Sequence, residues 1–174
     1  ILSRLVRNGK KLIYLDSAAT SQKPQVVIDA QNNFYETINS GVHRGAYYLA
    51  ELATDAHEHA RETIAAFVNI KPEQLVFTKN ATESLNLLSY SFLNATMKAK
   101  FGSVVDKRLI LNPGDEILVS ELEHHANLVP WQELCLKTGA VLKWIPITDQ
   151  GLLDYSNSES LTNPISNIIS VSHI

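Results

Sequence analysis

The 174-residue sequence has a single cysteine, Cys135, no long apolar run and no cluster of basic residues. One cysteine excludes an intramolecular disulfide framework and any zinc site that needs two cysteines of this chain, and it favours a reducing, cytoplasmic location. No apolar stretch approaches the roughly 18 residues of a membrane-spanning helix, so no membrane partner is expected. The 15 basic and 18 acidic residues give a net charge of −3, which argues against nucleic acid as a partner.

Several catalytic signatures are also missing from the sequence. It contains no Gly-x-Ser-x-Gly, no Walker loop and no Gly-x-Gly-x-x-Gly, so hydrolases, nucleotidases and dinucleotide-binding enzymes lose their usual sequence support. Cys135 falls in a predicted helix near Trp131 and Leu134, and we expect it to be a small buried apolar residue rather than a nucleophile. The composition, 45% hydrophobic and 19% charged, is typical of a folded globular domain.

Hydrophobic residues alternate between helical and strand periods along the chain, which predicts an α/β fold with a mostly parallel sheet flanked by helices. Helices are predicted after Pro24 with a left-handed cap near Gly41, over residues 49–67, around residues 85–92 and over residues 128–137. Strands are predicted over residues 75–78, 116–120, 140–147 and 168–171. Residues 95–108 lack a clean period and are interpreted as a surface loop or an extended helix end.

The segment Thr78–Glu83 follows a predicted strand and leads into a helix. Ligands of open parallel sheets bind at the carboxyl ends of the strands, and a helix amino terminus offers free amides to an anion. Thr82 adds a hydroxyl group, so this segment is a candidate phosphate site. The same residues also predict a helix cap, with Asn80 as the capping residue and Glu83 closing a variant capping box. The two interpretations are compatible.

The segment Glu121–Asn127 also follows a predicted strand and combines carboxylates with imidazoles. Imidazole titrates near neutrality and can stack on an aromatic ring. We expect the adjacent His124 and His125 to point in different directions, so a shared metal ion is disfavoured and no metal site is predicted. The trio His57–His59 lies within a predicted helix and is interpreted as a solvated face.

The loop Gly41–Gly45 joins two predicted helices and carries His43 and Arg44 between its glycines. A guanidinium in such a loop can bind a carboxylate or a phosphate of a ligand. An ordinary turn whose arginine pairs with a neighbouring carboxylate is equally consistent with the pattern.

Four segments in order resemble the group II, SUF-type cysteine desulfurases, which belong to the class V aminotransferase family of pyridoxal-phosphate enzymes. These segments are Tyr14–Thr20, Val42–Gly45, Thr78–Asn86 and Glu123–Trp131. The resemblance implies part of the large domain of a fold type I enzyme. Residues 1–45 would form an amino-terminal segment with the interhelical loop, and residues 46–174 a truncated amino-terminal part of the cofactor-binding large domain, with residues 95–108 as an insertion.

The resemblance also implies pyridoxal 5'-phosphate as the cofactor and L-cysteine as the substrate, which the family converts to L-alanine and an enzyme persulfide for iron–sulfur cluster assembly. His124 is the implied catalytic residue, stacked on the pyridine ring, while Thr82 and the amides of Ala81 and Thr82 would hold the phosphate. The implied substrate-binding residues are Ala18, Ala19, His43 and Arg44. A sulfur-acceptor protein of the SUF system and a second subunit, in a homodimer, are the implied protein partners.

The sequence departs from the family pattern at several positions. Ala81 stands where a second threonine is common, Lys79 and Asn80 replace an arginine and a glycine, and Tyr47 replaces a histidine. The family's cofactor-pairing aspartate, Schiff-base lysine and persulfide cysteine would all come after Ile174. Because these groups are absent and no initiator methionine is present, we expect a piece of a longer enzyme that is inactive by itself.

Two alternatives stay open at this point. The chain could be a short non-catalytic binding or dimerisation module of the same fold, although a terminal apolar strand leaves sheet edges unpaired. The parent could also be a selenocysteine lyase or another class V aminotransferase relative, which substrate comparison would distinguish from a cysteine desulfurase.

Overall fold

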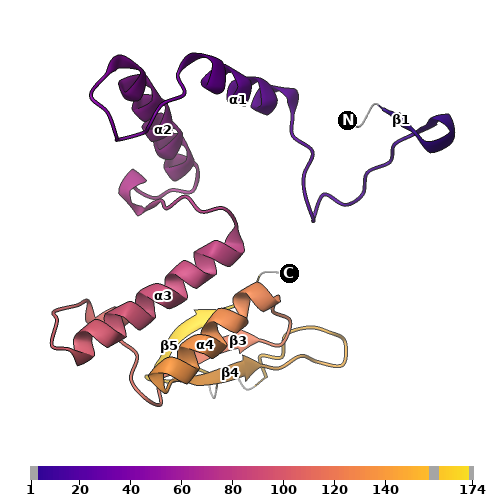
Figure 1. The fold of residues 1–174 in the computed structure, drawn as a ribbon. Helices are drawn as coiled ribbons and strands as arrows, with labels where there is room; N and C mark the ends of the chain where they lie inside the picture. The colour runs from indigo at the N-terminus through magenta and orange to yellow at the C-terminus, as the bar shows by residue number, and fades with distance from the viewer. Residues whose placement is uncertain (1–3, 157–160, 173–174) are drawn as a thin grey trace. The chain divides into compact units, whose positions relative to one another are not determined.

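The structure is a computed structural model that describes residues 4–156 and 161–172. The chain divides into two compact units, Ile1–Val76 and Phe77–Ile174, and each is described by itself (Figure 1). The division after residue 45, which assigns residues 46–174 to the cofactor-binding large domain, stays a prediction. Within the described ranges, no helix is both long enough and apolar enough to cross a membrane.

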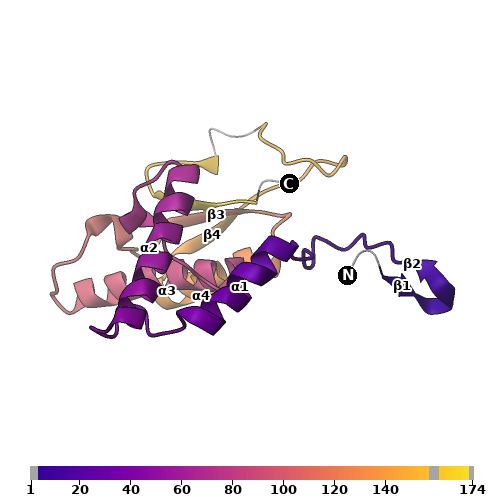
Figure 2. The same ribbon diagram turned by 90° about the horizontal axis from the view of Figure 1, so that it is seen from above.

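The first unit contains a short hairpin and two helices. Its elements are β1 (Leu5–Val6), β2 (Lys10–Lys11), α1 (Gln25–Thr37) and α2 (Tyr48–Phe67), with β1 and β2 antiparallel (Figure 2). Both predicted helices are confirmed. The predicted left-handed cap at Gly41 is wrong, because α1 ends at Thr37 and its C-cap residue is Ile38, whose φ is −134° and whose amide donates to the Phe34 carbonyl at 3.0 Å.

The strand predicted over Leu75–Thr78 does not form. These residues follow a single 3-10 turn, Pro72–Gln74, and belong to no strand of the described residues; Leu75 itself has an extended backbone. The guanidinium of Arg61 donates from Nη1 to the Leu75 carbonyl oxygen at 2.5 Å. A β-rich composition alone does not form a strand, because a strand needs a partner in a ladder.

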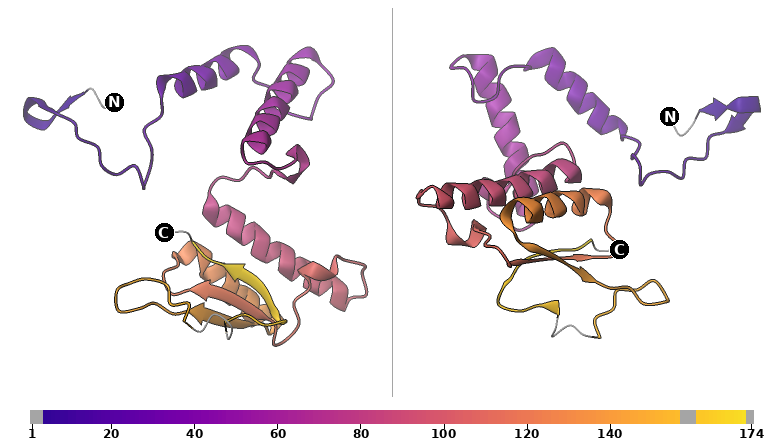
Figure 3. Two further views of the ribbon diagram at one scale, coloured as in Figure 1. Left: turned by 180° about the vertical axis from the view of Figure 1, so that it is seen from behind. Right: turned by 60° about the horizontal axis from the view of Figure 1, so that its bottom comes forward.

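The second unit is a three-stranded parallel sheet covered by helices. The strands are β3 (Glu116–Ser120), β4 (Val141–Ile145) and β5 (Ser166–Ser170), in the order β4-β3-β5. Two helices, α3 (Ala81–Lys100) and α4 (Val129–Thr138), lie on the same face of this sheet (Figure 3). The predicted α/β architecture is confirmed, as are these helices and strands, although α3 extends well beyond the predicted residues 85–92 at both ends.

The core of the second unit lies between the sheet and its helices. Ile117 and Val119 of the central strand are fully buried, and they pack with Trp131 and Leu134 of α4. Phe92 and other apolar residues of α3 border the same cluster. β3 is buried along its whole length, as expected for the middle strand of a covered parallel sheet. This packing holds β3 and α4 in fixed positions relative to each other.

Two loops of this unit follow its helices. Gly139 caps α4 with a left-handed φ of 85°, and a Cβ there would lie 3.1 Å from the Cβ of Pro113, so the position favours glycine. In the 95–108 stretch, α3 continues to Lys100 and a loop follows. The Leu111 amide then donates to Thr96 Oγ1 at 2.9 Å in the interior, which fastens the far end of that loop to α3.

Candidate functional site

A cavity of about 330 Å³ lies where the loop after β3 meets the start of α3. It is lined by Thr82, Asn86, His124, His125, Ala126, Val129 and Pro130. The structure thus brings together Thr82 and His124, two of the predicted cofactor-binding residues, and Ala81 precedes Thr82 as the first residue of α3. This volume is within the usual range for small-molecule sites.

The start of α3 has a geometry that suits both predicted roles, the helix cap and the phosphate site. Asn80 Oδ1 accepts the Glu83 amide at 2.9 Å, and Glu83 Oε2 accepts the Lys79 amide at 2.5 Å, which is a capping box shifted by one residue. The amides of Ala81 and Thr82 have no acceptor among the described residues. Free amides and the positive end of the helix dipole favour an anion at this place.

His124 is held in one orientation by the backbone that follows it. Its Nδ1 accepts the amide of Ala126 at 3.0 Å, and therefore the neutral ring carries its proton on Nε2. The ring is exposed and stands at 85° to the ring of His125. Both histidines line the cavity, so the expectation that they point in different directions stays a prediction. The imidazole of His124 can present a flat face and an N–H to a ligand.

The sequence interpretation missed a hydrogen-bond network centred on Glu123. Its carboxylate accepts bonds from Ser120, from Asn127 and from both the amide and the hydroxyl of Ser172, at distances between 2.6 and 2.8 Å. The only sequence signal was the i,i+4 spacing of Glu123 and Asn127. Ser172 comes from the end of β5, and its proximity follows only from the strand order.

The environment of Glu123 also changes its acidity. Partial burial raises the pKa of this carboxyl, but the hydrogen bonds from Ser120, Asn127 and Ser172 outweigh burial and hold the pKa below its usual value. A carboxyl with a lowered folded-state pKa stabilises the fold above its unfolded pKa, and this stability is lost as the pH falls through the folded pKa. The network therefore weakens only in acid.

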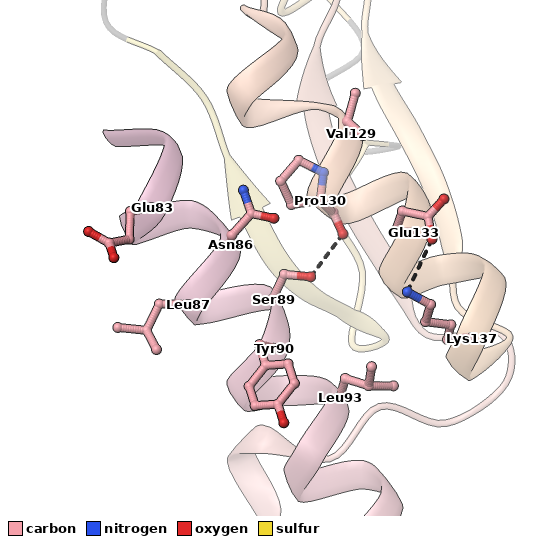
Figure 4. Close-up of a pocket in the computed structure, with 10 residues that line it drawn as sticks. All are labelled: Glu83, Asn86, Leu87, Ser89, Tyr90, Leu93, Val129, Pro130, Glu133 and Lys137. Carbon is pink, nitrogen blue, oxygen red and sulfur yellow. Dashed lines mark hydrogen bonds and ion pairs between the residues drawn. The ribbon is translucent and has the colours of Figure 1, made fainter. Parts of the chain in front are cut away.

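A second cavity of about 470 Å³ runs along the groove between α3 and α4 (Figure 4). Asn86, Val129 and Pro130 line both cavities. In the groove, Ser89 Oγ donates to the Pro130 carbonyl at 2.8 Å, and Lys137 pairs with Glu133 at 3.1 Å (Figure 4). The buried Ser89 bond fixes the first turn of α4, and with it one wall of the smaller cavity, relative to α3.

In the first unit, His43 is anchored to α2. Its φ is 56°, its amide donates to Thr54 Oγ1 at 3.1 Å and its Nε2 donates to Glu58 at 3.0 Å. Arg61 donates to the other oxygen of Glu58 at 3.1 Å. The hydrogen bond from His43, assisted by the charge of Arg61, lowers the pKa of Glu58. The solvated-face interpretation of residues 57–59 is therefore wrong for Glu58, which joins α2 to the loop.

The other predicted substrate-binding residues also lie in the first unit. Arg44 is exposed and forms no ion pair with a described residue, so the alternative in which this arginine pairs with a neighbouring carboxylate is not supported. Ala18 and Ala19 occupy an exposed turn in which the Ala19 amide donates to the Asp16 carbonyl at 3.2 Å. The roles of these residues in binding a substrate stay predictions.

Cys135 lies on α4 and borders the core cluster. Burial raises the pKa of its thiol, which disfavours the thiolate that a nucleophile requires. This agrees with the expectation that Cys135 is a packing residue. In the part of the chain that the structure describes, no three His, Cys, Asp or Glu side chains are grouped to hold a metal ion.

A parallel sheet with a helix start and an imidazole near its carboxyl edge is typical of a ligand-binding α/β domain. It matches part of the fold of cysteine desulfurases, which is fold type I of the pyridoxal-phosphate enzymes. The chain matches the family Aminotransferase class-V over residues 13–174. It therefore belongs to the class V aminotransferase family.

Among curated relatives, a probable cysteine desulfurase 2 of Mycobacterium leprae is 51% identical over 154 residues, or 88% of this chain and 35% of the relative. A probable cysteine desulfurase of Streptomyces coelicolor is 44% identical over 98% of this chain and 38% of its own length. The apo structure of a cysteine desulfurase from Thermococcus onnurineus NA1 has a TM-score of 0.79 and 35% identity, over 93% of this chain and 36% of that one. The chain thus spans about a third of the length of these proteins.

Proposed function

We propose that this chain is the amino-terminal part of a SUF-type cysteine desulfurase, which converts L-cysteine to L-alanine and an enzyme persulfide for iron–sulfur cluster assembly. The observation that carries the proposal is the cavity that joins Thr82 at the start of α3 to the oriented ring of His124. The identity to cysteine desulfurases supports the reaction class. The Val-His-Arg-Gly and Glu-His-His-Ala-Asn segments support the SUF group.

The residues of the cavity fit pyridoxal 5'-phosphate. The amides of Ala81 and Thr82, with the Thr82 hydroxyl, would hold the phosphate at the positive end of α3, and His124 would pack its ring on the cofactor. The bound cofactor supplies an electron sink for the amino acid. His124 would keep a proton at Nε2, where it is available for transfer, because Nδ1 is occupied by the Ala126 amide.

The substrate side of the proposal rests on residues of the first unit. Arg44 offers an exposed guanidinium that suits the carboxylate of L-cysteine, and the small side chains of Ala18 and Ala19 would leave room for it. His43 would bring an imidazole fixed by Glu58 to the same place. Residues 46–174 would belong to the cofactor-binding large domain, and residues 1–45 to the segment that precedes it.

The remaining parts of the reaction would be supplied by other polypeptide. A Schiff-base lysine, a partner for the pyridine nitrogen and a persulfide cysteine would follow in the longer enzyme, so the 174 residues alone would not complete the cycle. A homodimer in the cytoplasm, delivering sulfur to an acceptor protein of the SUF system, completes the proposal. Exposed apolar side chains such as Ile169 on β5, 56% exposed, suit a surface that further polypeptide would cover.

The test begins with reading the source DNA past the Ile174 codon and expressing the complete open reading frame. We expect the product to release alanine and form a persulfide from L-cysteine. Stronger activity with selenocysteine would favour a selenocysteine lyase, and transfer from an amino acid to an oxo acid would favour an aminotransferase. A stop directly after Ile174, with a stable folded product, would replace the proposal by the non-catalytic module.

Thr82→Val in the complete enzyme is expected to raise the dissociation constant of pyridoxal phosphate about tenfold. Valine has nearly the same shape but lacks the hydroxyl, and a hydrogen bond to a charged group contributes roughly 1.5–3 kcal/mol. Equilibrium dialysis of the cofactor measures the change. Thr63→Val is the matched control, because Thr63 is an exposed threonine of α2 whose hydroxyl donates to the His59 carbonyl of its own helix. An unaltered dissociation constant for Thr82→Val would contradict the phosphate role.

A further inference from the structure

The carboxylate of Glu123 links three separate segments of the second unit. Oε1 accepts Ser120 Oγ at the end of β3 at 2.6 Å and the Ser172 amide after β5 at 2.8 Å. Oε2 accepts Asn127 Nδ2 and Ser172 Oγ, both at 2.7 Å. No ion pair to Glu123 occurs among the described residues, so neutral donors alone hold its charge. The loop carrying His124 is thereby fastened at both of its ends.

The orientation of Asn127 is itself determined by the core. Its Oδ1 accepts Trp131 Nε1 at 3.0 Å and Ser170 Oγ at 2.5 Å. An indole N–H can only donate, so a reversed amide would place its own N–H₂ group against that donor. Asn127 must therefore direct Nδ2 toward Glu123. The polar network is continuous from the buried Trp131 through Asn127 to the carboxylate.

We propose that Glu123 is the positioning residue of His124: by binding Ser120, Asn127 and Ser172 at once, it fixes the histidine loop against the end of β5. This inference rests on the proposed function and deepens it. His124 directly follows Glu123, and its Nδ1 takes the Ala126 amide within the same fastened loop. Without the hydrogen bonds of Glu123, the loop could move and the imidazole could leave the cavity that it lines together with Thr82. Positioning of this kind contributes strongly to catalytic rates.

Glu123→Gln tests the carboxylate with almost no change in volume. Each carboxylate oxygen accepts one nitrogen donor as well as one hydroxyl, namely the Ser172 amide on one side and Asn127 Nδ2 on the other. Hydroxyl groups can rotate, but these nitrogen donors cannot become acceptors. In either orientation the glutamine N–H₂ group therefore meets a fixed donor, and the network loses at least one bond.

Glu121→Gln is the matched control. Glu121 lies in the same loop, and its Oε2 accepts the Ile147 amide at 3.0 Å. A glutamine can keep this single bond by directing its oxygen toward the amide. The same chemical change, two residues away, should therefore leave the rate, the cofactor signal and the exchange of the Ala126 amide unaltered.

The experiment is a double-mutant cycle in the complete enzyme loaded with pyridoxal phosphate. Glu123→Gln should lower the rate of persulfide formation about tenfold, reduce the induced circular dichroism of the cofactor and speed hydrogen exchange of the Ala126 amide at least tenfold. In a His124→Ala background the same substitution should change the rate by less than about twofold, because its effect passes through the histidine. Equal losses in both backgrounds, or an unchanged Ala126 amide, would overturn the proposal.

Two further measurements keep the outcomes distinct. If Glu123→Gln does not fold, Ser172→Ala removes only one hydroxyl donor and should speed Ala126 exchange about twofold to fivefold; unchanged exchange would count against the network. If the wild-type enzyme forms no persulfide from cysteine, the proposed function fails. Amide exchange and the nitrogen chemical shifts of His124 still test Glu123 in that case, because neither readout requires turnover.

Discussion

His124→Ala in the complete enzyme is expected to slow desulfuration about 10²–10⁴-fold, the usual range for loss of a positioned acid–base group. The structure gives the reason. The Ala126 amide occupies Nδ1, so the neutral ring keeps its proton on Nε2, at the wall of a cavity that also contains Thr82. Persulfide and alanine formation under single-turnover conditions measure the rate, and the absorption spectrum of the bound cofactor should change with it.

Two variants separate the roles of the imidazole. His124→Phe keeps a flat ring that can pack on the cofactor but cannot transfer a proton, so it should retain most of the cofactor affinity and lose most of the rate. His59→Ala, on the exposed surface of α2, is the control for removing a histidine from the protein. If His124→Ala changes the rate by less than about threefold, the assignment of His124 as the acid–base group is wrong.

The elements that the sequence predicts well are determined by residues close together in the chain. β3 was predicted over the same residues that form it, because a run of apolar residues between a turn and a polar loop is typical of a covered strand. The helix predicted over residues 128–137 matches α4 closely, because its apolar residues recur at helical spacing. The cap of α3 was readable from Asn80 and Glu83, because the atoms involved are at most a turn apart.

The predictions that failed depended on partners distant in the sequence. Leu75–Thr78 has the composition of a strand but pairs with no strand among the described residues. The mid-helix position of Glu58 suggested a solvated face, yet His43 reaches it from fifteen residues earlier in the chain. Sequence periodicity describes the face of a helix and not what packs on it.

The candidate site also combines features that are local in the sequence with contacts between distant residues. Thr82 and His124 were identified by their places after predicted strands and by the family motifs, and the structure places both on one cavity. The link between Glu123 and Ser172 spans 49 residues and could not be predicted without knowing that β5 pairs with β3. The candidate site residues are therefore recognisable in the sequence, whereas the hydrogen-bond network beside them depends on the sheet order.

Trp131 connects this network to the core, which makes its loss costly. Its side chain is 2% exposed among Ile117, Leu134 and other residues of the core cluster, and its Nε1 bonds to Asn127. Trp131→Ala should reduce the free energy of unfolding by about 3–5 kcal/mol, the usual cost of removing a buried aromatic side chain. Urea unfolding followed by circular dichroism measures this loss.

Matched variants show which part of Trp131 matters. Trp144→Ala removes the other tryptophan, which is 40% exposed on β4, and should cost much less than Trp131→Ala. Trp131→Phe keeps most of the packing but lacks the N–H, so Asn127 Oδ1 loses one of its two donors and the side chain that binds Glu123 is held less firmly. We therefore expect Trp131→Phe to fold and yet to speed exchange of the Ala126 amide, as Glu123→Gln does. Equal costs for the two tryptophan-to-alanine variants would contradict the central place of Trp131, because burial and the Asn127 bond are what distinguish it from Trp144.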